Sequence, residues 1–132
     1  MNAYQTAYAK ALALKETASE AHNDHETQFF NDRGLTRREA YSRDDIMNEY
    51  DNDPTANELL NSYFNAVDLY VEAENRLISW GLSLVPDGLR KDVERAANRP
   101  KFRNRLVDIF MKLNTKCGDA AVKKQLATLY GG

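Results

Sequence analysis

Apolar residues recur at steps of three and four along nearly the whole of this 132-residue sequence. The pattern is strongest over residues 54–79, where its large members are Leu60, Tyr63, Phe64, Val67, Tyr70, Val71, Leu77 and Ile78. This spacing places side chains on one face of an α-helix, whereas a half-buried strand alternates apolar and polar residues. No run of such alternation suggests a sheet. The sequence therefore predicts an all-α fold, a single compact domain over residues 1–132 with five to six helices around one long central helix.

Turn and capping residues divide the pattern into segments. Thr36 and Glu39 match a capping box, and Pro54 fits the first turn of a helix, where its missing N–H is harmless. The predicted helices cover residues 2–30, 36–50 (one irregular helix or two short ones), 54–79, 88–98, a segment from Pro100 to Gly118 and a last helix after Asp119. Few large apolar residues support the second segment, so we expect it to be the least rigid. We expect the central helix to bury Phe64 and Val67, so that Ala at either position costs about 2–5 kcal/mol.

Charge is sorted by sequence position. Residues 1–89 carry 16 acids and 7 Lys/Arg, a net of −9, whereas residues 90–124 carry 4 acids and 11 Lys/Arg, a net of +7. The two parts nearly cancel, so the net charge of −2 hides a strong dipole. Charge asymmetry of this kind steers partners and says little about fold. We therefore expect an acidic and a basic subregion within the domain.

Several classes of protein are disfavoured by composition. No apolar run approaches the ~18 residues of a membrane span, and the N-terminus has no basic region followed by an apolar stretch. The only cysteine is Cys117, which excludes an internal disulfide and favours a cytoplasmic protein. Phosphate-binding loops, dinucleotide-binding glycine patterns and nucleophile elbows are absent. We therefore expect a protein without a membrane segment that functions by binding a partner through its surface.

The leading hypothesis is a non-enzymatic interaction protein whose acidic half docks on a basic surface of a protein partner. Its predicted contacts lie on and just beyond the weakly supported segment and are Asp44, Asp45, Glu49, Asp51 and Asp53. By analogy of size and character, such a protein would be an inhibitor or modulator of a nucleic-acid-handling complex, of the kind that mobile elements encode. Calcium is rejected as the ligand, because an EF-hand loop starting at Asp51 would place Ala56 and Ser62 where glycine and glutamate are needed.

The alternative is direct binding of nucleic acid by the basic region, Arg90 to Lys124. Phosphate contacts require cations clustered on one face. The candidate residues are Arg99, Lys101, Arg103, Arg105 and Lys112. The region lacks zinc-finger spacing and the aromatic motif of RNA-recognition domains, so the prediction depends on charge density alone.

A third hypothesis is an enzyme that uses Glu74, His22 and His25. On a helix His22 lies three residues from His25 and four from Glu26, so all three could face one ion. The segment nevertheless lacks the His-Glu-x-x-His zinc signature, and we expect no metal and no cofactor. Glu74 falls on the apolar stripe, where an unpaired carboxylate is costly. We therefore expect it to have a partner: a tyrosine hydroxyl, Arg76 or a histidine of the first helix.

Overall fold

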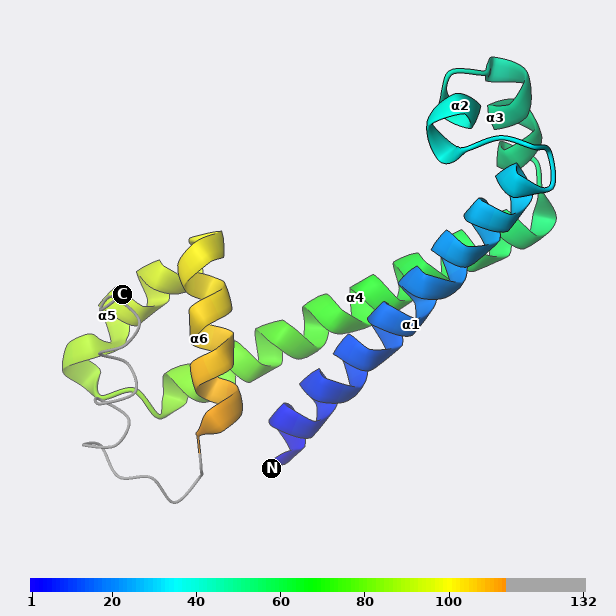
Figure 1. Cartoon of the computed structure of the whole chain (residues 1–132). Helices are drawn as coiled ribbons and strands as arrows, with labels where there is room; N and C mark the ends of the chain where they lie inside the picture. The colour runs from blue at the N-terminus through cyan, green and yellow to red at the C-terminus, as the bar shows by residue number, and fades with distance from the viewer. Residues whose placement is uncertain (114–132) are drawn as a thin grey trace. The chain divides into compact units, whose positions relative to one another are not determined.

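The computed structural model describes residues 1–113, and this part of the chain consists of helices and turns without a strand (Figure 1). Its helices are α1 (Ala3–Asn31), α2 (Arg37–Tyr41), α3 (Asp44–Asp51), α4 (Pro54–Ser83), α5 (Asp87–Ala97) and α6 (Pro100–Lys112). The predicted all-α fold is confirmed, and α4, with 30 residues, is its longest helix. The segment over residues 36–50, predicted as one irregular helix or two short ones, forms the two short helices α2 and α3. The helix predicted from Pro100 to Gly118 ends earlier, at Lys112, because the backbone of Leu113 is extended. Cys117 and the helix predicted after Asp119 lie outside the described residues.

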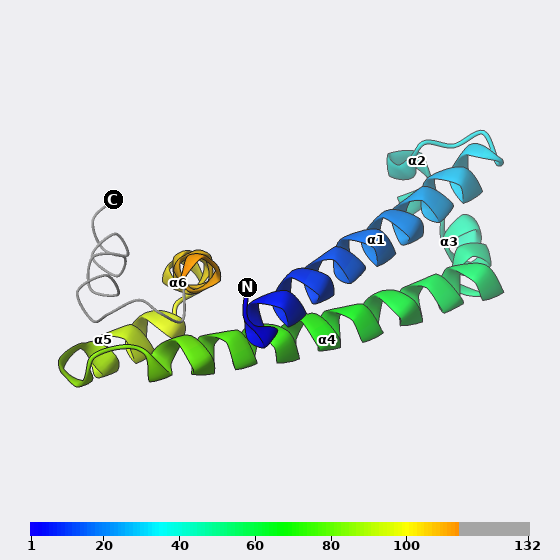
Figure 2. The ribbon, with the colours of Figure 1, turned by 90° about the horizontal axis from the view of Figure 1, so that it is seen from below.

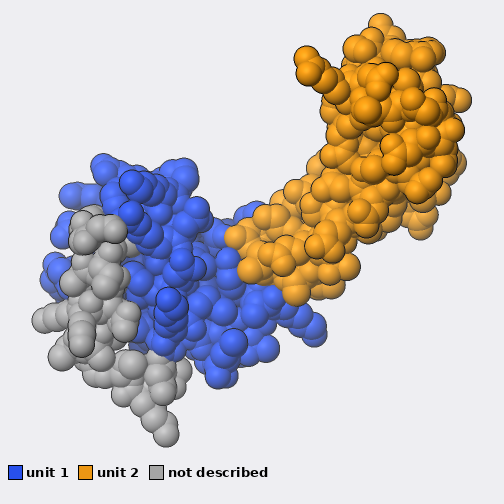
Figure 3. Space-filling view, in the orientation of Figure 1, with its two compact units in different colours: residues 1–10, 71–132 blue, residues 11–70 orange. Residues whose placement is uncertain are grey.

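The chain divides into two compact units, coloured separately in Figure 3. Unit 1 comprises residues 1–10 and 71–132, and unit 2 comprises residues 11–70. The helices α1 and α4 each contribute to both units. The prediction of one domain with acidic and basic subregions stays a prediction, and each unit is described by itself below.

Unit 2 is a helical hairpin closed at one end by α2 and α3. In Figure 1 the latter half of α1 lies along the first half of α4, and in Figure 2 the two segments diverge toward α2 and α3. The chain leaves α1 through Gly34, whose φ of +71° suits glycine, and enters α2 through the capping box of Thr36 and Glu39. The core at this closed end consists of Phe29, Phe30, Ala40, Ile46, Tyr50 and Ala56. The short helices thus supply buried residues, although their sequence offers few large apolar side chains.

The apolar stripe of α4 is only partly buried. Phe64 is 53% exposed and Val71 is 48% exposed, so the prediction that this stripe is buried along its length is wrong at these positions. The buried residues in that stretch are Ala66 and Ala73. The small side chains of these alanines let α1 approach α4 closely. Because a single neighbouring helix covers only a narrow face of α4, the outer residues of its wide apolar stripe stay exposed. Farther along, Leu77 and Ile78 are buried as predicted.

In unit 1 the end of α4 packs against α6 at a glycine, so that a side chain of α6 contacts the backbone of α4 directly. The ring of Phe110, which is fully buried, lies against the backbone of Gly81. Among the described residues of this unit, Leu77, Val85 and Leu106 are also fully buried. The absence of a Cβ at Gly81 therefore sets how closely these two helices approach.

The first turn of α1 is joined to the end of α6 by a buried glutamine. Asn2 and Gln5 cap α1 reciprocally, each side-chain oxygen accepting a hydrogen bond from the other's backbone N–H. The Gln5 Nε2 also donates to the carbonyl oxygens of Phe110 and Leu113, at 2.8 and 2.7 Å. These carbonyls belong to the last turn of α6, which has no intrahelical partners for them. Gln5 therefore completes one helix start and one helix end at once.

Candidate protein-interaction surface

Negative charge gathers on unit 2. By sequence, residues 11–70 hold 13 acids and 5 Lys/Arg, a net of −8, whereas the rest of the chain holds 7 acids and 13 Lys/Arg, a net of +6. The compact units therefore differ in charge much as the two sequence halves do. Because these negative charges lie close together on a small helical hairpin, their electric fields add and attract a positively charged partner.

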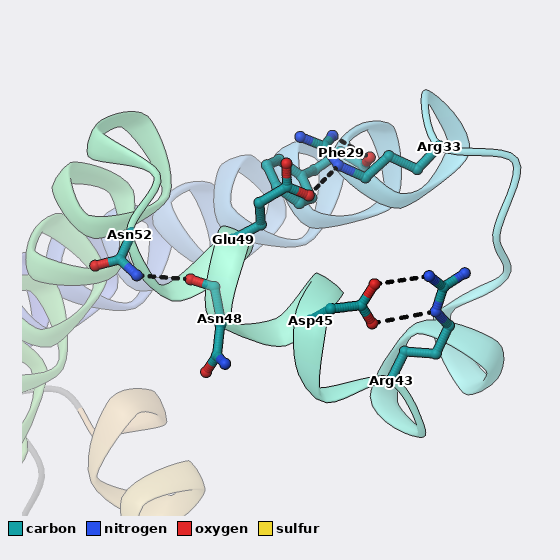
Figure 4. A network of polar contacts seen from close by, with 7 residues as sticks. All are labelled: Phe29, Arg33, Arg43, Asp45, Asn48, Glu49 and Asn52. Atoms are coloured by element: carbon teal, nitrogen blue, oxygen red, sulfur yellow. Dashed lines mark hydrogen bonds and ion pairs between the residues drawn. The ribbon is translucent and has the colours of Figure 1, made fainter.

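Two of the five acids predicted to contact a partner are already paired with arginines of the same unit (Figure 4). The Arg43 guanidinium donates to both carboxylate oxygens of Asp45, at 2.7 and 3.2 Å. Arg33 donates to Glu49 at 3.0 Å and lies 3.5 Å from the ring centre of Phe29. Exposed ion pairs of this kind contribute little to stability, because solvent screens them. A basic partner could displace these arginines, but it would gain less from Asp45 and Glu49 than from unpaired carboxylates.

The other three predicted contacts differ from one another. Asp44 and Asp51 are exposed and form no ion pair within residues 1–113. Asp53 accepts hydrogen bonds from the backbone N–H of Ala56, at 2.9 Å, and lies 2.7 Å from the His25 Nε2. It caps α4 and ties that helix to α1, so its role in the structure is local. Asp44 and Asp51 are the two predicted contacts that remain available to a partner.

The histidines do not converge on an ion. His25 is bound to Asp53, and His22 Nε2 lies 3.3 Å from the Tyr50 hydroxyl. Glu26 is buried, accepts a hydrogen bond from the Tyr41 hydroxyl and forms an ion pair with Arg37, whose Nε lies 3.0 Å from the carboxylate. The bond to Glu26 raises the pKa of the Tyr41 hydroxyl. Within the described residues no group of three or more His, Cys, Asp or Glu side chains could hold a metal.

The contact between Asp53 and His25 predicts a change of stability with pH. The hydrogen bond from His25, followed by that from Ala56, lowers the pKa of the Asp53 carboxyl. A group whose pKa is lowered by folding stabilises the folded state at pH values above its ordinary pKa, which is about 3.9 for this carboxyl. This stabilisation is lost as the pH falls through the lowered pKa. Asp53→Asn keeps a helix cap but removes the charge. We expect it to lower the Tm at neutral pH, and the difference from wild type to shrink as the pH is lowered below about 4.

Thermal unfolding followed by circular dichroism across the acid range checks this expectation. Asp44→Asn is the matched control, because Asp44 is exposed and forms no ion pair within the described residues. A difference between wild type and Asp53→Asn that stays constant with pH would show that the charge of Asp53 does not contribute.

An open groove runs along the side of the hairpin between α1 and α4. Its volume is about 400 Å³, and its residues are Leu14, Thr17, Ala18, Ala21, Leu59, Ser62, Asn65, Ala66 and Leu69. Leu14 and Leu69 are 50% and 52% exposed, so their apolar surface is open to solvent. The sequence pattern does not indicate this groove, because its walls belong to two helices that lie far apart in the chain. An exposed apolar surface that is bordered by charge is typical of an interaction site.

Two carboxylates extend the face on which this groove lies. Asp24 follows Ala21 by three residues on α1, and Glu58 precedes Ser62 by four residues on α4. Residues so spaced lie on the same side of a helix, one turn apart. Both are exposed, and neither forms an ion pair within residues 1–113. The groove thus has an apolar floor and negative charge beyond one end.

The predicted nucleic-acid contacts of unit 1 are also divided. Arg103 donates to Glu74 at 2.6 Å, to Asn75 and to the carbonyl of Ala97, so it holds α4, α5 and α6 together. The partner of Glu74 is therefore Arg103, and the expectation of a tyrosine, Arg76 or a histidine is wrong. The sequence pattern missed this pair because its members lie 29 residues apart on different helices.

The remaining four candidate cations differ in their surroundings. Arg105 is half-buried, with its guanidinium 5.9 Å from the ring centre of Phe102. Arg99, Lys101 and Lys112 are exposed and form no ion pair within the described part of the chain. Unit 1 therefore presents positive charge, but fewer cations are available than the sequence suggested.

The comparisons with known proteins identify no relative. No family model matches the chain, and neither the curated proteins nor the solved structures include a match. Within residues 1–113, no helix combines the length and the apolar character needed to cross a bilayer. The function is therefore inferred from the surface itself.

Proposed function

We propose that the protein is a non-enzymatic interaction protein that binds a basic partner through unit 2. The observation that carries this proposal is that one small hairpin holds both an open apolar groove and exposed carboxylates that form no ion pair within the described residues. Asp24, Asp44, Asp51 and Glu58 are the acids concerned. Of the arginines in this unit, Arg33, Arg37 and Arg43 are already bound to carboxylates.

The two features play different roles in binding. Charges at the rim of an interface speed the encounter and select against partners of the same sign, but add little affinity. Apolar side chains supply the affinity, since full burial of a leucine stabilises by about 1.5–3 kcal/mol. A groove between two helices fits an amphipathic helix whose apolar face enters it. The chemistry that suits unit 2 is therefore a helix with leucine-like residues on one face and Lys or Arg on the other.

Complexes that handle nucleic acid carry basic surfaces of this kind. A small acidic protein that covers such a surface would compete with nucleic acid for it. Unit 2 fits an inhibitor or modulator with this mode of action, acting in the cytoplasm.

The test uses a fluorescent amphipathic peptide of leucine and lysine, whose binding is followed by anisotropy. We expect the double variant Asp24→Lys and Glu58→Lys to weaken binding by roughly three- to thirty-fold, since each exposed ion contact contributes a few tenths to 1 kcal/mol. Added salt should weaken wild-type binding and have less effect on the variant. Leu69→Ser should weaken binding by about tenfold at any salt concentration, because its contribution is apolar.

Glu94→Lys with Asp108→Lys is the matched control. Both residues are exposed acids of unit 1, and the double change alters the net charge of the protein by the same amount. If this control weakens binding as much as the unit 2 variant, net charge and not the groove determines binding. If the peptide does not bind the wild type, the proposed surface is wrong.

A further inference from the structure

Unit 1 contains a second open pocket, separate in chemistry from the groove of unit 2. Its volume is about 640 Å³, and its aromatic walls are Tyr4, from the first turn of α1, and Trp80, near the end of α4. The remaining lining comes from α4 and is Glu72, Asn75, Arg76, Ser79 and Ser83. The pocket is thus a flat aromatic surface beside a row of polar side chains.

The two rings are arranged as a platform. Their planes are within 18° of parallel, with ring centres 6.3 Å apart, and Tyr4 is 45% exposed. A separation of this size corresponds to offset stacking, in which the two rings overlap only in part and part of each ring face stays uncovered. A planar, electron-poor ring can stack on such a surface, and stacking of one nucleobase on an aromatic side chain contributes about 1–3 kcal/mol.

The polar side chains supply hydrogen bonds and one cation. The Asn75 Oδ1 accepts a hydrogen bond from Arg103 at 2.7 Å, so its amide hydrogens remain free to donate. Arg76 donates to Glu72 at 2.6 Å, but the side chains are 68% and 56% exposed. An ion pair so exposed is weak, and a phosphate can replace the carboxylate on Arg76.

The charge of the unit favours an anion. Residues 1–10 and 71–132 together have a net charge of +6. A cationic ligand such as an arginine side chain could also stack on Trp80, but it would be repelled by this field and would compete with Arg76 for Glu72. A ligand with a planar ring and a phosphate is suited to both the platform and the charge.

We propose that this pocket binds a nucleotide, with the base stacked on Tyr4 and Trp80 and the phosphate on Arg76. The same chemistry occurs in a free nucleotide and in a single strand of nucleic acid. This site lies wholly within unit 1 and does not depend on the proposed function of unit 2.

Trp80 provides the test, because it is the only tryptophan of the chain. Its fluorescence, excited at the red edge of its absorption, is recorded in the full-length protein during titration with AMP and with an oligodeoxyadenylate. We expect saturable quenching that weakens with salt. Tighter binding of the oligonucleotide would identify the ligand as a single strand, and equal binding of AMP would identify it as a free nucleotide.

Single substitutions separate this ligand from others. Tyr4→Leu should weaken binding by about 5- to 100-fold, which is the loss of one stacking contact. Arg76→Gln should also weaken binding. Glu72→Gln should strengthen it by a few-fold, because Arg76 is then free for phosphate. Phe64→Leu, an exposed aromatic residue of unit 2, is the control and should have no effect.

Two results would overturn the proposal. One is an absence of saturable quenching by either probe at millimolar nucleotide. The other is weaker binding of nucleotide by Glu72→Gln together with quenching by an arginine amide, which would identify a cation site. If Tyr4→Leu fails to fold, the substitutions of Glu72 and Arg76 still test the proposal. Tyr4→Phe adds a further test, because it keeps the aromatic ring and should retain binding.

Discussion

Replacing Gly81 with alanine is expected to destabilise the protein by about 3 kcal/mol, at the upper end of the usual cost of overpacking. Helix propensity alone would make the change stabilising by about 1 kcal/mol, because glycine is a poor helix former. The added Cβ, however, would lie 2.3 Å from ring atoms of Phe110. That ring is fully buried, so it cannot move without displacing its neighbours. The tertiary contact therefore reverses the sign that local propensity predicts.

Gly88→Ala is the matched control for this measurement. Gly88 also lies in a helix, α5, but a Cβ there would meet no atom within 4 Å. We expect it to leave the free energy of unfolding unchanged or slightly higher when both variants are measured by chemical denaturation. Combining Gly81→Ala with Phe110→Leu should recover part of the loss, because the smaller side chain makes room. Equal stabilities of Gly81→Ala and Gly88→Ala would show that Phe110 does not pack on this backbone.

The second large effect is expected at Phe30. It is 1% exposed and its ring contacts those of Phe29, Tyr41 and Tyr50. Phe30→Ala should lower the free energy of unfolding by about 3–5 kcal/mol, since a buried aromatic residue is lost and a cavity remains. The core at the closed end of unit 2 is small, so little else can fill that space.

Phe64→Ala serves as the comparison, because Phe64 is the same residue type on the same unit but 53% exposed. We expect a change of less than about 0.5 kcal/mol, which is usual for an exposed position. Fluorescence or circular dichroism in a urea series measures both variants. A loss at Phe64 as large as that at Phe30 would restore the sequence-based prediction of a buried stripe.

Much of the local structure could be predicted from the sequence. The capping box of Thr36 and Glu39 begins α2, and Pro54 begins α4 after the Asp53 cap, as expected. These features depend on hydrogen bonds between residues three or four positions apart, so the signal is contained in a short segment. The same holds for the all-α class, since helical periodicity is repeated along the chain.

The candidate sites were predictable only in part. The acidic character of the region around Asp44 and Asp51 follows from composition. That Asp45 and Glu49 are paired with arginines, and that Asp53 is bound to His25, depends on side-chain geometry. Neither the groove beside Leu14 and Leu69 nor the platform of Tyr4 and Trp80 has a sequence signature, since each joins residues from two helices far apart in the chain.

By itself, the sequence determined where most of the described helices begin, which residues carry charge and which faces are apolar. The tertiary structure decided which part of each apolar face is covered, leaving Phe64 exposed while Ala66 is buried. It also paired Glu74 with Arg103 and joined Gln5 to the end of α6, 105 residues away. The physical reason is the distance along the chain over which each interaction acts. Helix formation and capping are settled within a few residues, whereas burial and the choice of a polar partner depend on which helix comes to lie alongside.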